Sequence, residues 1–201
     1  TYNDDAHLDE CLRALDFCDE NIVIDLGSKD KSLDIAKKHK CTIYKHKRVL
    51  VVEEIKEWAV NKSKTDWVIF MDPDEIFRKE YVPLIKEKIQ SIKNLGSIAI
   101  PRQNYYMGKL VKYGRWGGVV YYPRIFNRKA FSYSPEVHRG TKLKKEYKEI
   151  KLREVKPFVH YWIDSEEQFY EKHNRYIEVE GKSRYNSGMR YGVNAYLDSL
   201  V

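Results

Sequence analysis

The stretch 67–77, WVIFMDPDEIF, places three acidic side chains directly after a run of five apolar residues. Such a run has the length of a buried strand, so Asp72, Asp74 and Glu75 lie where that strand would end. Ligands of open α/β sheets bind beyond the carboxyl ends of strands, and two carboxylates so close together suit Mg²⁺ or Mn²⁺. The alternative interpretation is that the acids cap a helix that begins near Lys79.

Apolar segments of strand length alternate with amphipathic segments of helix length through the first half of the chain. Strands are expected at 21–25, 41–44, 67–71 and 97–101, and helices at 7–18, 31–39, 52–64 and 82–92. Asp30 is in position to cap the helix 31–39. This alternation favours βαβ units, and hence an α/β fold with a mostly parallel central sheet flanked by helices.

The second half, 102–201, is richer in Tyr, Gly and Arg and has fewer helix signals. Strands are expected at 119–126 and 155–162. Ser165 and Gln168 have the spacing of a capping box that opens a helix reaching to about Glu180. We therefore expect the 201 residues to form a single α/β domain with an irregular, aromatic second half.

Asp25 is a second acidic residue at the end of an expected strand. If the sheet is parallel, Asp25 shares one edge of it with Asp72 and Asp74 and faces the same crevice. This placement favours a metal site over simple helix capping.

The composition of the chain limits which classes of binding partner and which cellular locations are expected. The formal charge of +7 and the pI near 9.1 suit an anionic partner or a merely lysine-rich protein. Lys residues stand among Glu residues rather than in a basic arm, which disfavours nucleic acid. The three cysteines lack metal-ligand spacing and indicate reduced thiols in a cytoplasmic protein. No apolar run approaches the roughly 20 residues of a membrane-spanning helix.

Several motifs resemble, in order, those of the family 2 glycosyltransferases of GT-A fold, including their members that act on lipopolysaccharide cores and small ones encoded by large DNA viruses. The motifs are TYNDD, IVIDLGSKDKS, DWVIFMDPDE, YPRIFNR, VHRG and VHYW followed by YEKHNRY. The resemblance implies a metal-dependent, inverting transfer of a hexose or deoxyhexose from a UDP-sugar to a hydroxyl of a glycan or glycolipid. It implies Mn²⁺ or Mg²⁺ as cofactor, a nucleotide-sugar half at 1–101 and an acceptor half at 102–201. The family's first strand would precede Thr1.

The resemblance also implies roles for particular residues on the donor side. Thr1, Tyr2 and Asn3 match the loop against the nucleotide, Asp25 the contact to the base, and Lys56 a cation near the donor. Asp72 and Asp74 match the pair that contacts ribose and metal, and His160 is a candidate third metal ligand, with an ordinary core histidine as the alternative. Lys172, Arg175 and Tyr176 are candidates to close over the diphosphate.

The acceptor side needs a base and a sugar-binding surface. Glu136 is the candidate base, with His138 assisting it or binding metal, although Arg139 stands where the family often has an acid. Aromatic residues of the segment 104–118 are candidates for gripping the acceptor. Those that we single out are Tyr106, Tyr113 and Trp116.

Three other functions stay open at this point. The charge and the Tyr/Arg-rich segment 102–128 are compatible with a basic nucleic-acid-binding module, although no nucleic-acid partner is our expectation. A nucleotidyltransferase would use the same metal and nucleotide but release pyrophosphate, and an inactive relative would bind carbohydrate only. The expected location is the cytoplasm, free or at a membrane surface, and the oligomeric state is open.

Overall fold

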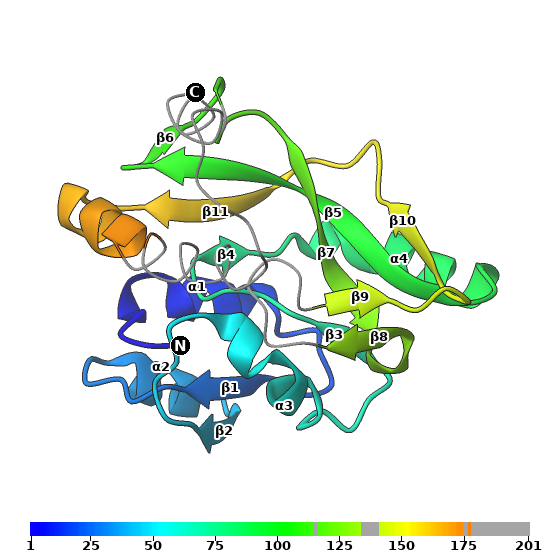
Figure 1. Cartoon of the computed structure of the whole chain (residues 1–201), viewed down its shortest axis with the longest axis horizontal. Helices are drawn as coiled ribbons and strands as arrows, with labels where there is room; N and C mark the ends of the chain where they lie inside the picture. Colours follow the sequence, from blue (N-terminus) through cyan, green and yellow to red (C-terminus); the bar gives the residue numbers. More distant parts are fainter. Residues whose placement is uncertain (115, 134–140, 175–176, 178–201) are drawn as a thin grey trace, which may run out of the picture.

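The chain is built around a seven-stranded mixed sheet, seen in a computed structural model that describes residues 1–114, 116–133, 141–174 and 177 (Figure 1). Its strands run in the order β3-β7-β5-β11-β4, and β6 and β10 also pair with β5. They comprise β3 (Trp67–Ile69), β4 (Glu75–Ile76), β5 (Leu95–Tyr106), β6 (Lys109–Leu110), β7 (Val120–Asn127), β10 (Lys148–Lys151) and β11 (Phe158–Ile163).

The expectation of a mostly parallel sheet is wrong for this layer. β5 is parallel to β10 and β11 but antiparallel to β6 and β7, and the pairs β3–β7 and β4–β11 are also antiparallel. The reason lies in the connections, because β5, β6 and β7 follow one another without the helical crossover that parallel neighbours need. β5 also runs through 12 residues, well beyond the five expected at 97–101.

A smaller unit has the expected βαβ form. β1 (Ile22–Asp25) and β2 (Thr42–Lys45) are parallel, and α2 (Ser32–Lys38) connects them. Helix α1 (Asp5–Ala14) lies between this unit and the large sheet, where it packs against α2 and β4 (Figure 1). The remaining elements are η1 (Val52–Glu54), α3 (Lys56–Val60), η2 (Lys79–Tyr81), α4 (Val82–Ser91), η3 (Arg128–Ala130), β8 (Phe131–Tyr133) and β9 (Thr141–Leu143).

Two helices expected from the sequence differ in how well the structure matches them. The helix expected over 52–64 divides into η1 and α3, because Ile55 has a non-helical backbone (φ −120°, ψ 0°) in a segment rich in β-branched residues. The capping box is confirmed: Gln168 N donates to Ser165 Oγ (3.1 Å), and the described part of the helix that follows covers 166–174 and residue 177. Its expected end near Glu180 lies outside the described residues. No described helix is long and apolar enough to cross a membrane.

Helix α1 joins the two sheets because it is apolar on more than one side. Leu8 and Leu12 pack with Val23 of β1 and Ala36 of α2 in one buried cluster. Cys11 belongs to the larger core between the main sheet, α1 and α4. This double packing holds the ends of β1 and β3 at the same region of the molecule.

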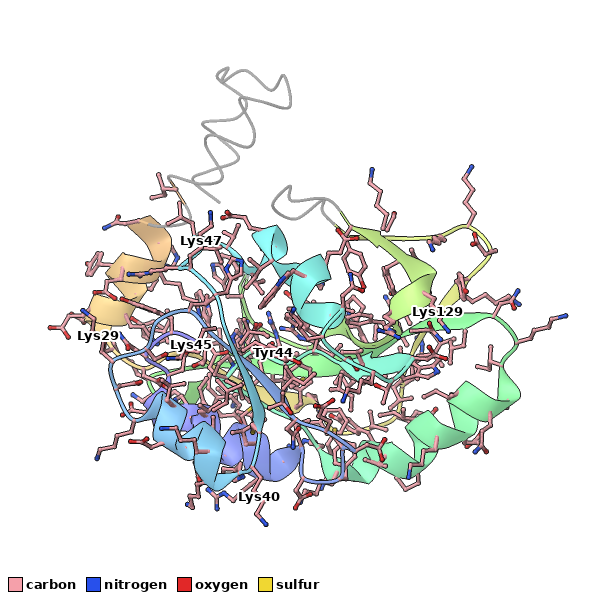
Figure 2. All side chains as sticks on the ribbon, turned by 90° about the horizontal axis from the view of Figure 1, so that it is seen from below. Lys29, Lys40, Tyr44, Lys45, Lys47 and Lys129 are labelled. Atoms are coloured by element: carbon pink, nitrogen blue, oxygen red, sulfur yellow. The ribbon has the colours of Figure 1, made fainter. Side chains whose placement is uncertain are left out.

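Positive charge gathers around β2, contrary to the expectation that Lys residues are evenly interspersed with acids. The segment 27–48 holds eight Lys or Arg residues and two Asp. Figure 2 shows Lys29, Lys40, Lys45 and Lys47 on this side, with Lys129 at the other end. Since β2 pairs only with β1 in the described part of the chain, these charges protect an open sheet edge from pairing with another chain.

Candidate functional site

Asp74 lies where β4 meets β11. The two strands pair antiparallel with Glu75 opposite His160, and Tyr161 N donates to the Asp74 carbonyl (2.8 Å). This pairing brings the Asp74 side chain to two cationic partners. Its Oδ2 lies 3.4 Å from His160 Nε2 and 3.5 Å from Lys172 Nζ.

The Asp74 carboxylate is held in its charged form. Burial acts to raise its pKa, but the hydrogen bond with His160 and the charges of His160 and Lys172 lower it to about 2. Its Oδ1 is buried and has no hydrogen-bond partner among the described residues. An ionised oxygen without a partner is well suited to accept a further cation.

Asn104 fixes the orientation of His160. The Asn104 Nδ2 donates to the carbonyl of Trp116 (2.8 Å), so its Oδ1 faces His160 Nδ1 at 2.8 Å. An amide oxygen only accepts, and therefore Nδ1 of His160 carries the proton. With Nδ1 bonded to Asn104, the ring directs Nε2 at Asp74, and this nitrogen is free to bind a metal when it gives up its proton.

The donor set fits a divalent metal held jointly with a ligand. No three His, Cys, Asp or Glu side chains among the described residues converge closely enough to hold a metal ion. Asp74 and His160 present two ligand atoms 3.4 Å apart, near the roughly 3 Å between adjacent ligands of an octahedral ion. Mg²⁺ and Mn²⁺ commonly complete their shell with water and phosphate oxygens. Asp74 and His160 could therefore hold such an ion together with a diphosphate.

Asp72 and Glu75 form a buried charge cluster with two arginines that sequence reasoning missed. Arg124 donates to Asp72 Oδ2 (2.8 Å) and to Glu75 Oε1, and Arg102 lies 3.3 Å from Glu75. Glu75 is fully buried in β4, so the alternative interpretation, in which it caps a helix beginning near Lys79, is wrong for this residue. Burial raises the pKa of Glu75, and Arg124 opposes that rise. Asp72 is thus oriented by Arg124, with its side chain still partly exposed.

The loops at 1–3 and 26–29 are tied together beside the end of β1. Asn3 Oδ1 accepts from Lys29 N (2.7 Å), and Asn3 N donates to Ser28 Oγ (3.1 Å). The buried Asp25 accepts from Ser28 N (2.9 Å). Gly27 adopts φ +96°, a conformation that the turn requires and that favours glycine. The result is a rigid shelf of polar groups at the end of β1.

Tyr2, in the loop 1–3, pairs with Arg48. The Arg48 guanidinium stacks 3.8 Å from the centre of the Tyr2 ring and donates to its hydroxyl (2.9 Å). The backbone nitrogen of Thr1 donates to the Ile24 carbonyl (2.7 Å), which ties this loop to β1.

Lys56 lies over the rings of Phe70 and Phe126. Its ammonium group is 5.4 Å from the Phe70 ring centre and 5.7 Å from that of Phe126. Burial and the charge of Arg124 lower its pKa, against the opposing charges of Glu53 and Asp72. A partly desolvated cation at this place is consistent with contact to an anionic ligand.

An aromatic cavity lies on the other side of Lys172. Its volume is about 750 Å³, and its walls include Tyr106, Tyr113, Trp116, Trp162, Phe169 and His173. Trp116 and Trp162 stack with their ring centres 5.0 Å apart. The three expected acceptor residues therefore do lie together, but sequence reasoning missed Trp162, Phe169 and His173, which read as ordinary strand and helix residues.

Four candidate residues lie outside the described part of the chain. They are Glu136, His138, Arg175 and Tyr176. The base and part of the diphosphate clamp therefore stay predictions from the sequence.

The comparisons with known proteins concern the family and the fold of the chain. The sequence model described as glycosyl transferase family 2 matches residues 1–195. The solved structure of S. aureus TarS, residues 1–349, superposes with a TM-score of 0.60 at 16% identity over 89% of this chain and 64% of that one. The chain thus spans under two thirds of that structure. Glucosyl-3-phosphoglycerate synthase from Mycobacterium tuberculosis, solved with Mn²⁺ and UDP-glucose, matches at 18% identity and a TM-score of 0.42 over 54% of this chain and 42% of that one. The expected GT-A fold is confirmed.

Proposed function

Since the chain belongs to glycosyltransferase family 2, we propose that it moves a hexose or deoxyhexose from a UDP-sugar to a hydroxyl of a glycan or glycolipid, with inversion and with Mn²⁺ or Mg²⁺. The observation that carries the proposal is the convergence of His160 and Lys172 on the charged, partly unpartnered carboxylate of Asp74. A nucleoside diphosphate leaving group needs such a centre, where positive charge can offset the charge that develops on it.

Asp74 and His160 would hold the metal, with Asp72 beside them. When bound, the metal acts as a Lewis acid on the diphosphate. Lys172 lies 3.5 Å from Asp74, and its ammonium group would be close enough to pair with a phosphate oxygen of a diphosphate bound there. Arg175 and Tyr176 are proposed to act with Lys172 from the same segment of the chain.

The nucleotide is proposed to bind at the shelf formed by the loops 1–3 and 26–29. Tyr2, stacked with Arg48, offers a flat surface for the base, and Asp25 can accept a hydrogen bond from it. Thr1 and Asn3 shape the same loop, and Lys56 contributes a cation near Asp72.

On the acceptor side we propose Glu136 as the base, assisted by His138, with Tyr106, Tyr113 and Trp116 holding the acceptor. A base in this role takes the proton of the acceptor hydroxyl. The oxygen of that hydroxyl attacks the anomeric carbon of the donor sugar, and UDP leaves. We propose that the reaction takes place in the cytoplasm.

The decisive experiment measures UDP binding by calorimetry with Mn²⁺ and with EDTA, together with product release from a panel of UDP-sugars. UDP should bind at least about tenfold more tightly with Mn²⁺. Asp74→Asn should abolish that gain, whereas Asp34→Asn, on the exposed face of α2, should keep it. Equal UDP affinity with and without metal would contradict the metal role, and pyrophosphate release would indicate a nucleotidyltransferase instead.

A separate variant tests the base. Glu136→Gln should lower the transfer rate by about 10²–10⁴-fold while UDP binding stays unchanged, because a base acts on the acceptor proton and not on the nucleotide. An unchanged transfer rate would move the role to another residue.

A further inference from the structure

The aromatic cavity beside Lys172 has the features of a built sugar-ring site. We propose that it binds one ring of the acceptor by stacking on the Trp116–Trp162 pair, which rests on the proposed transferase function. The residues that line the cavity come from β5, β6, β11, the segment 111–116 and the helix that begins at residue 166. Figure 1 shows β6 and the adjoining ends of β5 and β11 at one end of the molecule. The cavity volume of about 750 Å³ is within the range of about 300–1,000 Å³ for small-molecule sites.

The walls are aromatic and partly exposed, which is unusual for a region with no ligand role. Trp116 is 49% exposed and Tyr113 86% exposed, although both are large apolar side chains. Trp162 holds the Trp116 ring nearly parallel to its own, at an interplanar angle of 26°. Tyr106 packs against Trp162 from the side, and Phe169 in turn packs edge-on against Tyr106. Exposed apolar surface that is clustered and rigidly supported marks a binding site.

The polar groups around the cavity distinguish a sugar ring from a hydrocarbon chain. A pyranose has an apolar C–H face and a rim of hydroxyls. The tryptophans can receive the face, and the hydroxyls of Tyr106 and Tyr113 with the side chains of Lys109 and His173 can bond the rim. No carboxylate lines the cavity in the described part of the chain, so an anionic substituent on the ring is also tolerated.

Two hydrogen bonds place this cavity next to the donor centre. Lys172 Nζ, which faces Asp74, donates to the Trp162 carbonyl (3.0 Å). Asn104, which orients His160, donates to the Trp116 carbonyl (2.8 Å). Both tryptophans are therefore bonded through their backbones to the side chains that line the Asp74 site. The proposed acceptor site and the Asp74 site are therefore neighbours.

The test is saturation-transfer NMR with methyl β-D-glucopyranoside and octyl β-D-glucopyranoside as probes. The ring C–H protons of both probes should receive saturation from the protein. Trp116→Ala should weaken binding about tenfold or more, because central aromatic residues of a site dominate its affinity. Trp116→Phe should retain most of it. The matched control is Tyr170→Ala. Tyr170 lies on the helix that also carries Phe169 and His173, but it is 63% exposed and outside the cavity. This variant should bind the glucosides as wild type does.

Three outcomes would overturn the inference. They are ring signals that persist undiminished in Trp116→Ala, saturation confined to the octyl chain, and no transfer to either probe. UDP binding in the presence of Mn²⁺ is measured on the same samples. Wild type that binds the glucosides but not UDP would contradict the proposed function and leave the sugar site standing, whereas the reverse result would contradict only the sugar site.

Discussion

Replacing Asn104 tests whether the structure prepares His160 for a metal. Asn104 and His160 are both buried, and Asn104 Oδ1 accepts the Nδ1 proton of His160 at 2.8 Å. Asn104→Leu removes that acceptor with little change in side-chain size. Two effects follow. Nδ1 loses its hydrogen-bond partner, and the ring is no longer held in the orientation that directs Nε2 at Asp74.

The magnitude follows from these two effects. A buried donor left without a partner costs about 1–3 kcal/mol of folding stability. Loss of a residue that orients a metal ligand lowers metal affinity by about 10–100-fold, or about 1.4–2.8 kcal/mol. Asn104→Asp keeps an acceptor oxygen for His160 but loses the amino group that bonds the Trp116 carbonyl. The Mn²⁺ affinity of Asn104→Asp should stay within a few-fold of wild type. Its defect should be weaker sugar binding at the aromatic cavity, because the bond to Trp116 is lost.

The assays separate orientation from folding. Calorimetry measures Mn²⁺ affinity in the presence of UDP, and two-bond ¹⁵N–¹H spectra with Mg²⁺ report which nitrogen of His160 carries the proton. Wild type and Asn104→Asp should show the Nδ1 proton, and Asn104→Leu should show a mixture. If folded Asn104→Leu binds Mn²⁺ as tightly as wild type, Asn104 does not position the ligand.

Three further predictions concern stability, each measured by urea unfolding against wild type. Glu75→Gln should cost about 3–5 kcal/mol, because it leaves the buried Arg124 charge without its main partner, whereas the exposed Glu80→Gln should change stability by less than about 0.5 kcal/mol. Gly96→Ala should cost about 1–3 kcal/mol, since the added Cβ would lie 2.8 Å from three side-chain atoms of neighbouring elements, and wild-type stability would refute that packing. Asp30→Ala should cost about 1 kcal/mol at pH 7. Burial opposes ionisation of Asp30, but its hydrogen bonds outweigh burial and lower its pKa. The difference in free energy of unfolding between Asp30→Ala and wild type should therefore shrink as the pH falls below about 4. A difference that does not depend on pH would contradict this account.

The parts of the molecule that sequence reasoning predicted depend on local signals. Asp30 accepts from Ser32 N (3.0 Å), and Ser165 caps the helix at 166–174, because both interactions join residues only a few positions apart. The acids Asp25 and Asp74 stood out because each follows an apolar strand, and strand ends define the binding edge of an α/β domain.

Other parts could not be predicted because they depend on contacts between distant segments. Arg124 is 49 residues from Glu75. Neither the motif YPRIFNR nor the motif DWVIFMDPDE indicates that the two side chains meet in the fold. The direction of each strand likewise depends on which neighbour it finds, and apolar patterning is the same for parallel and antiparallel strands. The position of Asn104 within a strand also depends on distant segments, since β11 and β6 pair with this part of β5.

The register between β5 and β11 connects the donor centre with the aromatic cavity. In this parallel pair His160 lies beside Asn104, and Tyr161 lies beside Tyr105. The register then shifts, so that Ile163 pairs with Tyr106 and Trp162 becomes the extra residue of an irregularity. Such irregularities bend a strand and redirect a side chain, often beside an active site. A one-residue slip in the regular part would send Asn104 to the face opposite His160. The same pairing therefore orients the metal-side histidine and frees Trp162 to stack on Trp116, which is why we expect changes in this register to impair donor and acceptor binding together.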